Sequence, residues 1–157
     1  MRILRLLVLF SVPVCLCAQS GIPSGHDDLI ETPQSLIESD AVAKVLVIHL
    51  TDSTMTRVSV TRQALLSMAS STFEITTDIK KRLDPVFTGI SYEKESHTPD
   101  LRWGVLFRNV HNREIGSVFV DKFGEHGYVN KEAVRFRVAQ SGSNLAKELH
   151  KLTGDPH

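Results

Sequence analysis

Histidine side chains are the residues of this sequence best suited to proton transfer or metal binding, and the chain has seven of them: His26, His49, His97, His111, His126, His150 and His157. No two form an HxH, HxxxH or HExxH motif, the spacings at which imidazoles share one face and bind zinc. Three residues in successive predicted turns, His111, Asp121 and His126, could still form a metal site, but solvated turn residues are the simpler interpretation. We therefore expect no metal and no other cofactor.

Two histidines are candidate general bases. His49 ends an apolar strand and is followed by Thr51 and Asp52, so a carboxylate could orient its ring. His126 lies in a polar turn that follows Asp121, which gives a second candidate His/Asp pair. The alternative for both is a hydrogen-bonded structural histidine.

Other catalytic motifs are not found. The sequence has no GxSxG motif, and Ser141-Gly142-Ser143 is explained by a loop that leads into a helix. The acidic residues Glu93, Glu95 and Asp100 are typical of a solvated loop rather than of a glycosidase pair. The glycines of residues 123–127 suit a turn and lack the GxxxxGK[ST] pattern that holds phosphate.

Four arginines form the one candidate binding surface that we find on the predicted sheet. Strand alternation would place them on one polar face, which could bind an anionic partner or be the solvated side of the sheet. They are Arg102, Arg108, Arg135 and Arg137. Trp103 alternates with apolar residues and is expected in the core rather than on a sugar-binding surface.

The elements that must position these residues are short and mixed. An apolar run at residues 41–50 predicts a central strand, followed by a helix at 61–69 that Thr61 caps and a strand at 72–76. A second helix opens at Thr77 and should end or kink at Asp84-Pro85.

The second half of the chain predicts a meander and a last helix. Residues 101–109 and 114–121 alternate as a hairpin, and residues 128–130 and 133–138 suggest another. A helix at 143–152, capped by Ser143, follows. We therefore expect an α+β fold, with a mostly antiparallel sheet of about five to six strands and two to three helices packed on one face. Twelve residues form the expected core: Val45, Val47, Phe73, Ile75, Leu83, Trp103, Val105, Phe107, Phe119, Phe136, Leu145 and Leu149.

Residues 1–20 have the layout of a secretory signal peptide. Arg2 and Arg5 precede an uncharged apolar run over residues 6–16, and small or polar residues follow. The run is shorter than the roughly 20 residues that span a bilayer. We expect cleavage near residues 17–20, a periplasmic or secreted product, and no membrane insertion afterwards. A lipid anchor on a leader cysteine is disfavoured, because Val14 and Leu16 precede Cys15 and Cys17 where small residues are usual.

The predicted organisation is a signal peptide at 1–20, a flexible tether at 21–40 and a single globular domain at 41–157. Both cysteines lie in the leader, so the mature domain has no disulfide and no thiol chemistry. The chain has 18 basic and 18 acidic residues, which gives it no electrostatic signature of a nucleic-acid or anionic-membrane partner.

One stretch shows a resemblance. Residues 103–109 read WGVLFRN, and residues 117–130 read SVFVDKFGEHGYVN. This part of the chain resembles small exported bacterial proteins of unknown function that have a Trp-containing hairpin followed by a D-[RK]-F-G-x-x-G turn. The resemblance implies a bacterial source and supports the hairpin. It implies no site residue, because those proteins have no assigned activity.

These observations favour an exported domain that binds a protein partner and is not an enzyme. The expected contact surfaces are the turns at residues 110–113 and 122–127, or an exposed sheet edge. A small hydrolase that uses a His/Asp pair is the first alternative, and a structural protein of the cell envelope is the second.

Overall fold

The computed structural model describes residues 33–154 apart from residues 52, 55–57, 89, 131–133 and 141–143, and at residues 91, 92, 134–136, 139 and 140 it describes the backbone alone. The predicted signal peptide and the first part of the predicted tether lie outside these residues. The described elements are, in chain order, α1 (Pro33–Glu38), β1 (Lys44–His49), α2 (Arg62–Met68), β2 (Ser71–Ile75), α3 (Ile79–Phe87), β3 (Ser91–Lys94), β4 (Leu101–Arg108), β5 (Glu114–Asp121), β6 (His126–Val129), β7 (Val134–Gln140) and α4 (Leu145–Thr153).

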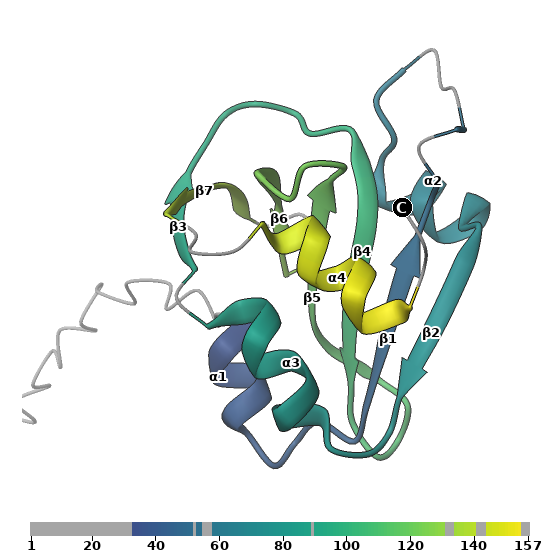
Figure 1. The fold of residues 1–157 in the computed structure, drawn as a ribbon, viewed down its shortest axis with the longest axis vertical. Coiled ribbons are helices and arrows are strands. Elements are labelled where there is room, and N and C mark those ends of the chain that lie inside the picture. Colours follow the sequence, from purple (N-terminus) through teal and green to yellow (C-terminus); the bar gives the residue numbers. More distant parts are fainter. Residues whose placement is uncertain are drawn as a thin grey trace, which may run out of the picture.

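The strands form one antiparallel sheet in the order β2-β1-β4-β5-β6-β7-β3 (Figure 1). The α+β fold with an antiparallel sheet is therefore confirmed. The described residues contain seven strands and four helices, more of both than the sequence predicted. The additional strand is β3, which pairs with β7 and forms one edge of the sheet.

Helices cover both faces of the sheet, whereas the sequence predicted them on one face. The larger core joins the sheet to α1, α3 and α4, and includes Trp103, Leu83 and Leu149. The smaller core lies on the opposite face, where Leu65 of α2 packs with residues such as Leu106. Strands β1 and β4 carry apolar residues on both faces of the sheet. Because burying apolar area stabilises the fold, the second face is also covered, by α2.

The predicted core is largely confirmed. Ten of its members are buried: Val45, Val47, Ile75, Leu83, Trp103, Val105, Phe107, Phe119, Leu145 and Leu149. Phe73 is only half-buried because β2 is an edge strand, and the guanidinium of Arg82 lies 5.1 Å from the centroid of its ring. The side chain of Phe136 lies outside the described residues. Each buried large side chain contributes about 1.5–3 kcal/mol, so the domain has a core of ordinary strength without disulfides.

Helix α1 differs from the flexible tether predicted for residues 21–40. Leu36 and Ile37 are buried in the larger core, and α1 packs against α3 and β5. Pro33 starts the helix, where a missing backbone N–H costs nothing. The packed domain therefore begins at least as early as Pro33.

The helix ends follow the sequence signals in part. Thr61 caps α2 by accepting a hydrogen bond from Ala64, as predicted. Asp78, rather than Thr77, precedes α3, and this helix continues through Pro85 to Phe87 because Val86 and Phe87 are buried. Asn144 caps α4 by accepting a hydrogen bond from Lys147, and the predicted cap Ser143 lies outside the described residues. None of the described helices has the length and apolar character required to cross a bilayer.

Candidate functional site

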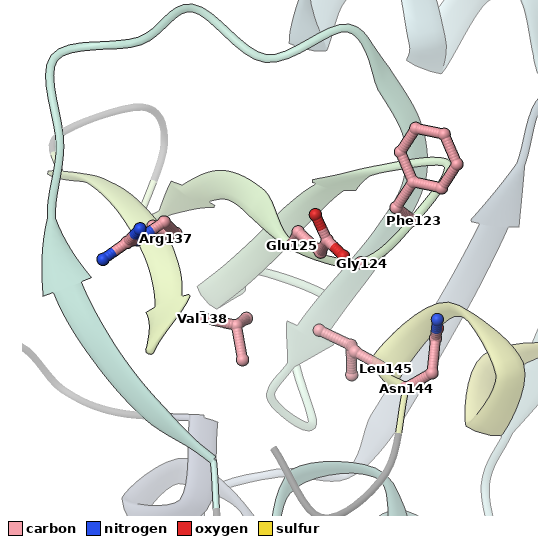
Figure 2. A pocket seen from close by; sticks show the side chains of 7 residues that line it. All are labelled: Phe123, Gly124, Glu125, Arg137, Val138, Asn144 and Leu145. Carbon is pink, nitrogen blue, oxygen red and sulfur yellow. The ribbon is translucent and has the colours of Figure 1, made fainter. Parts of the chain in front are cut away.

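A pocket of about 380 Å³ lies where the turn after β5 meets β7 and the start of α4 (Figure 2). The turn contributes three residues to its lining, β7 two, and the start of α4 two. They are Phe123, Gly124, Glu125, Arg137, Val138, Asn144 and Leu145. The pocket thus combines apolar walls with charged and amide side chains, a composition that is common in binding sites.

Asp121 builds the turn that forms one wall of this pocket. Its Oδ1 accepts hydrogen bonds from the backbone nitrogens of Phe123, at 3.1 Å, and Glu125, at 3.0 Å. Its backbone oxygen accepts a third from Gly124 at 3.1 Å. Asp121 is only 8% exposed. The candidate catalytic carboxylate is therefore placed as a turn-forming residue.

Gly124 joins this turn to α4. Its φ of 71° is left-handed, and a Cβ atom at its position would lie 2.6 Å from the backbone nitrogen of Ala146. Only glycine combines this backbone conformation with so close an approach. The turn and the first residues of α4 therefore form one continuous wall.

Phe123 is the exposed apolar residue of the pocket. Its side chain is 53% exposed, and Lys122 Nζ lies 4.7 Å from the centroid of its ring. Leu145 points from α4 towards Val138 on β7 (Figure 2) and is only 1% exposed, so it belongs to the core beneath the pocket. The 2.7 Å hydrogen bond from Val138 N to Glu125 O holds β7 against the turn.

His126 has an acidic partner, but this partner is Glu95. His126 Nδ1 lies 2.6 Å from Glu95 Oε2, and the ring of His97 makes an edge contact with the His126 ring at 5.3 Å between centroids. The long loop after β3 brings Glu95 to β6, 31 residues further along the chain. Sequence reasoning missed this pair because β3 was not predicted.

Arg137 lies beside this histidine. In the sheet register it is opposite His126 on β6 and Glu93 on β3, so the three side chains project from one face. Arg137 Nη2 donates to Glu93 Oε2 at 2.7 Å. The hydrogen bond that Arg137 donates to Glu93, together with the negative charge of this carboxylate, raises the pKa of the Arg137 guanidinium.

His49 is placed in a buried aromatic cluster. Its ring stacks on Trp103 with 3.8 Å between centroids and 9° between planes. His150 of α4 makes edge contacts with both rings, at 5.1 Å from His49 and 4.6 Å from Trp103. His49 is 5% exposed, and Asp52 lies outside the described residues. This environment is that of a core residue.

The three arginines whose side chains the structure describes, Arg102, Arg108 and Arg137, have separate partners and are not gathered at one anion-binding site. Arg102 is 7% exposed and donates to Asp100 Oδ2 at 2.8 Å and to Thr54 O at 2.9 Å. Arg108, at the far end of β4, donates to Asn112 at 3.1 Å, while the side chain of Arg135 lies outside the described residues. Together with the Arg137–Glu93 pair, these contacts turn the predicted polar face into separate local pairs.

The sequence offered His111, Asp121 and His126 only as an alternative metal site, and the structure does not bring the three together. His111 lies in the turn before β5, while Asp121 is the last residue of β5 and His126 is the first residue of β6. An eight-residue strand separates its two ends by about 25 Å. Among the described residues, no group of three or more His, Cys, Asp or Glu side chains is arranged to hold a metal ion.

Comparison of the chain with protein-family models, with curated proteins and with solved structures gave no match.

Proposed function

We propose that this chain is an exported bacterial domain that binds a protein partner through the pocket beside the 122–125 turn. Export is supported by the charged, apolar and polar segments of residues 1–20. The observation that carries the binding site is Phe123, which is 53% exposed at the edge of a 380 Å³ pocket.

An exposed aromatic side chain beside a pocket is typical of protein-binding surfaces. Aromatic residues supply much of the binding energy of interfaces, because they bury a large area and lose few rotamers. The polar residues around Phe123, such as Glu125 and Asn144, resemble the polar rim that surrounds such anchors. The alternative turn at 110–113 also exposes an apolar residue, Val110, but offers a short aliphatic side chain in place of an aromatic ring.

Site-specific photo-crosslinking tests this proposal. A photoreactive benzoylphenylalanine replaces Phe123 in one variant and Val58 in the control, since Val58 is 78% exposed and precedes α2 on the other face of the sheet. In the native compartment, we expect a discrete adduct of one protein from position 123 and none of it from position 58. Equal adducts from both positions, or none from either, would contradict the proposal.

A hydrolase is the second candidate, favoured by the 2.6 Å contact between His126 Nδ1 and Glu95 Oε2. A carboxylate that holds one ring nitrogen orients the imidazole, as in acid–base dyads. The side chains of His126 and Glu95 are 27% and 25% exposed, so solvent can reach the pair. The proposed pair is thus His/Glu rather than the His/Asp pair considered from the sequence.

A further inference from the structure

The sheet has two edges, and they differ in how well they are protected against pairing with another chain. At one edge, β3 has only four residues, an irregular register between Ser91 and Tyr92, and two charged residues, Glu93 and Lys94. Short length, irregular pairing and charge are the features that keep edge strands from adding a further strand. At the other edge, β2 pairs with β1 in a regular register along all five of its residues. Among the described elements none lies beyond β2 (Figure 1), so this edge is open.

The backbone groups that β2 turns outwards belong to Thr72 and Glu74. Leu50, which continues β1, donates its N–H to Arg102 O on β4, whereas His49 O accepts from the residue that precedes β2. Successive residues of a strand turn their backbone groups to opposite neighbours, so the odd-numbered residues of β1 face β2. Their register partners, the odd-numbered residues of β2, face β1 in return. The N–H and C=O groups of Thr72 and Glu74 are therefore left for a further strand.

The sequence of β2 is suited to pairing with a second copy of itself. In an antiparallel pair centred on Phe73, Thr72 of one copy lies opposite Glu74 of the other, and their outward backbone groups can exchange hydrogen bonds. The carboxylate of Glu74, which lies 3.4 Å from Lys44 Nζ, then faces a hydroxyl rather than a like charge. A shift that centres the pair on Glu74 would bring the two carboxylates opposite each other, which is destabilising.

Phe73 lies at the centre of such a pair. Its side chain is half-buried against the larger core, with the guanidinium of Arg82 5.1 Å from the centroid of its ring. The residue opposite it is the second Phe73, in a pair without hydrogen bonds whose Cα atoms lie about 4.5 Å apart. Aromatic side chains in this position stabilise antiparallel strands. We propose that two copies of this chain pair through β2, which makes one continuous sheet across a two-fold axis.

This dimer and the proposed partner binding use different parts of the molecule. The pocket beside the 122–125 turn is lined in part by β7, which lies next to the edge strand β3 at the opposite side of the sheet from β2. Either interaction can therefore fail without the other. A pair of five-residue strands is smaller than a standard interface, so we expect a weak dimer that forms at micromolar concentrations or above.

Disulfide trapping tests the pairing and its register, in a background where Cys15→Ser and Cys17→Ser remove the two cysteines of the sequence. The variant Phe73→Cys places two sulfurs across the two-fold axis, at a Cα separation that a disulfide allows. The matched control is Ser71→Cys, on the same edge and the same face, because its counterpart in the other copy lies about 13 Å away along the strand. Mild oxidation should give the disulfide dimer of Phe73→Cys at least about tenfold faster than that of Ser71→Cys.

Sedimentation of the unmodified protein and of Thr72→Pro is the second measurement. Thr72 turns its N–H outwards, so a proline there should block the second copy and leave the pairing with β1 intact. The apparent mass of the unmodified protein should rise towards that of a dimer between about 5 µM and about 500 µM, a range that suits a small interface, and Thr72→Pro should stay monomeric.

Three results would overturn the inference: a monomer at every concentration, equal trapping rates for Phe73→Cys and Ser71→Cys, or a dimer of Thr72→Pro as strong as that of the unmodified protein. A fourth would do the same by naming another occupant. If Phe73→Cys in its native cell formed a disulfide with a different protein and none with itself, the edge of β2 would belong to that protein's strand.

Discussion

Gly124 packs against Ala146 so closely that a Cβ atom on the glycine would lie 2.6 Å from the alanine nitrogen. This contact fixes the turn that carries Phe123 and Glu125 to the start of α4. The hydrogen bonds from Phe123 and Glu125 to Asp121 fix the same turn to β5. A surface held in this way loses little conformational freedom when it binds, which favours its use as a binding site.

Replacing Gly124 with alanine should therefore destabilise the domain by more than its backbone conformation alone explains. A left-handed residue costs about 1–2 kcal/mol when alanine replaces glycine, and the contact with Ala146 adds an overpacking cost of about 1–3 kcal/mol. The matched control is Gly154→Ala, because Gly154 has a similar φ of 68° and nothing within 4 Å of the added Cβ. Urea denaturation should show that Gly124→Ala lowers the unfolding free energy by more than Gly154→Ala does. Equal losses in the two variants would show that the packing against α4 is not tight.

His49 should behave as a packing residue of the core. The variant His49→Ala removes the ring that stacks on Trp103 and should lower the unfolding free energy by about 2–4 kcal/mol, as for other large-to-small core changes. The variant His49→Phe keeps a flat ring and should recover most of this loss. The readout is urea denaturation followed by the fluorescence of Trp103, the single tryptophan of the chain. A phenylalanine variant as unstable as the alanine variant would mean that polar contacts, rather than stacking, define this position.

Arg102 should contribute to stability through its buried contacts. The variant Arg102→Met keeps an unbranched apolar stem but removes the hydrogen bonds to Asp100 and Thr54. It should lower the unfolding free energy by about 2 kcal/mol. The control Arg113→Met changes an exposed arginine of the turn before β5, and its unfolding free energy should lie within about 0.5 kcal/mol of that of the unmodified protein. Both are measured by urea denaturation. A loss of unfolding free energy in Arg102→Met no larger than in the control would show that these buried hydrogen bonds do not contribute to stability.

The dyad of His126 and Glu95 gives a direct test of the hydrolase candidate. If this pair activates water or an acyl acceptor, the protein should hydrolyse p-nitrophenyl acetate about a hundredfold faster than His126→Gln, since general-base catalysis contributes at least that factor. The variant Glu95→Gln should be intermediate, and His111→Gln, in an exposed turn, should match the unmodified protein. Identical rates in all four proteins would remove the candidate.

The sequence predicted the elements with strong local signals. The hairpin of β4 and β5 was visible because apolar and polar residues alternate on either side of a polar turn, and Thr61 marked the start of α2. Helix α1 and strand β3 were not predicted as packed elements. Six residues, PQSLIE, and four, SYEK, carry too few apolar positions for a periodic pattern, and both are held by contacts with distant parts of the chain.

The site was predictable only in part, for the same reason. The 122–127 turn was expected as a contact surface, because its composition is local. The partners of its residues are not local: Glu95 reaches His126 through the pairing of β3 with β7, and α4 reaches Gly124 from the end of the chain. The stacking of His49 on Trp103 depends on the register of β1 with β4, which the sequence does not show. From the sequence alone, His49 therefore remains a candidate base.

The most direct test of partner binding through Phe123 is a calorimetric titration of the crosslinked partner into the unmodified protein, Phe123→Ser and the control Met68→Ser. Phe123 and Met68 are both exposed, at 53% and 46%, but Met68 ends α2, away from the pocket. If Phe123 anchors the partner, Phe123→Ser should raise Kd by about 30-fold, the effect of losing an interface hot spot, and Met68→Ser should leave Kd unchanged. A Phe123→Ser variant that binds as tightly as the unmodified protein would contradict it.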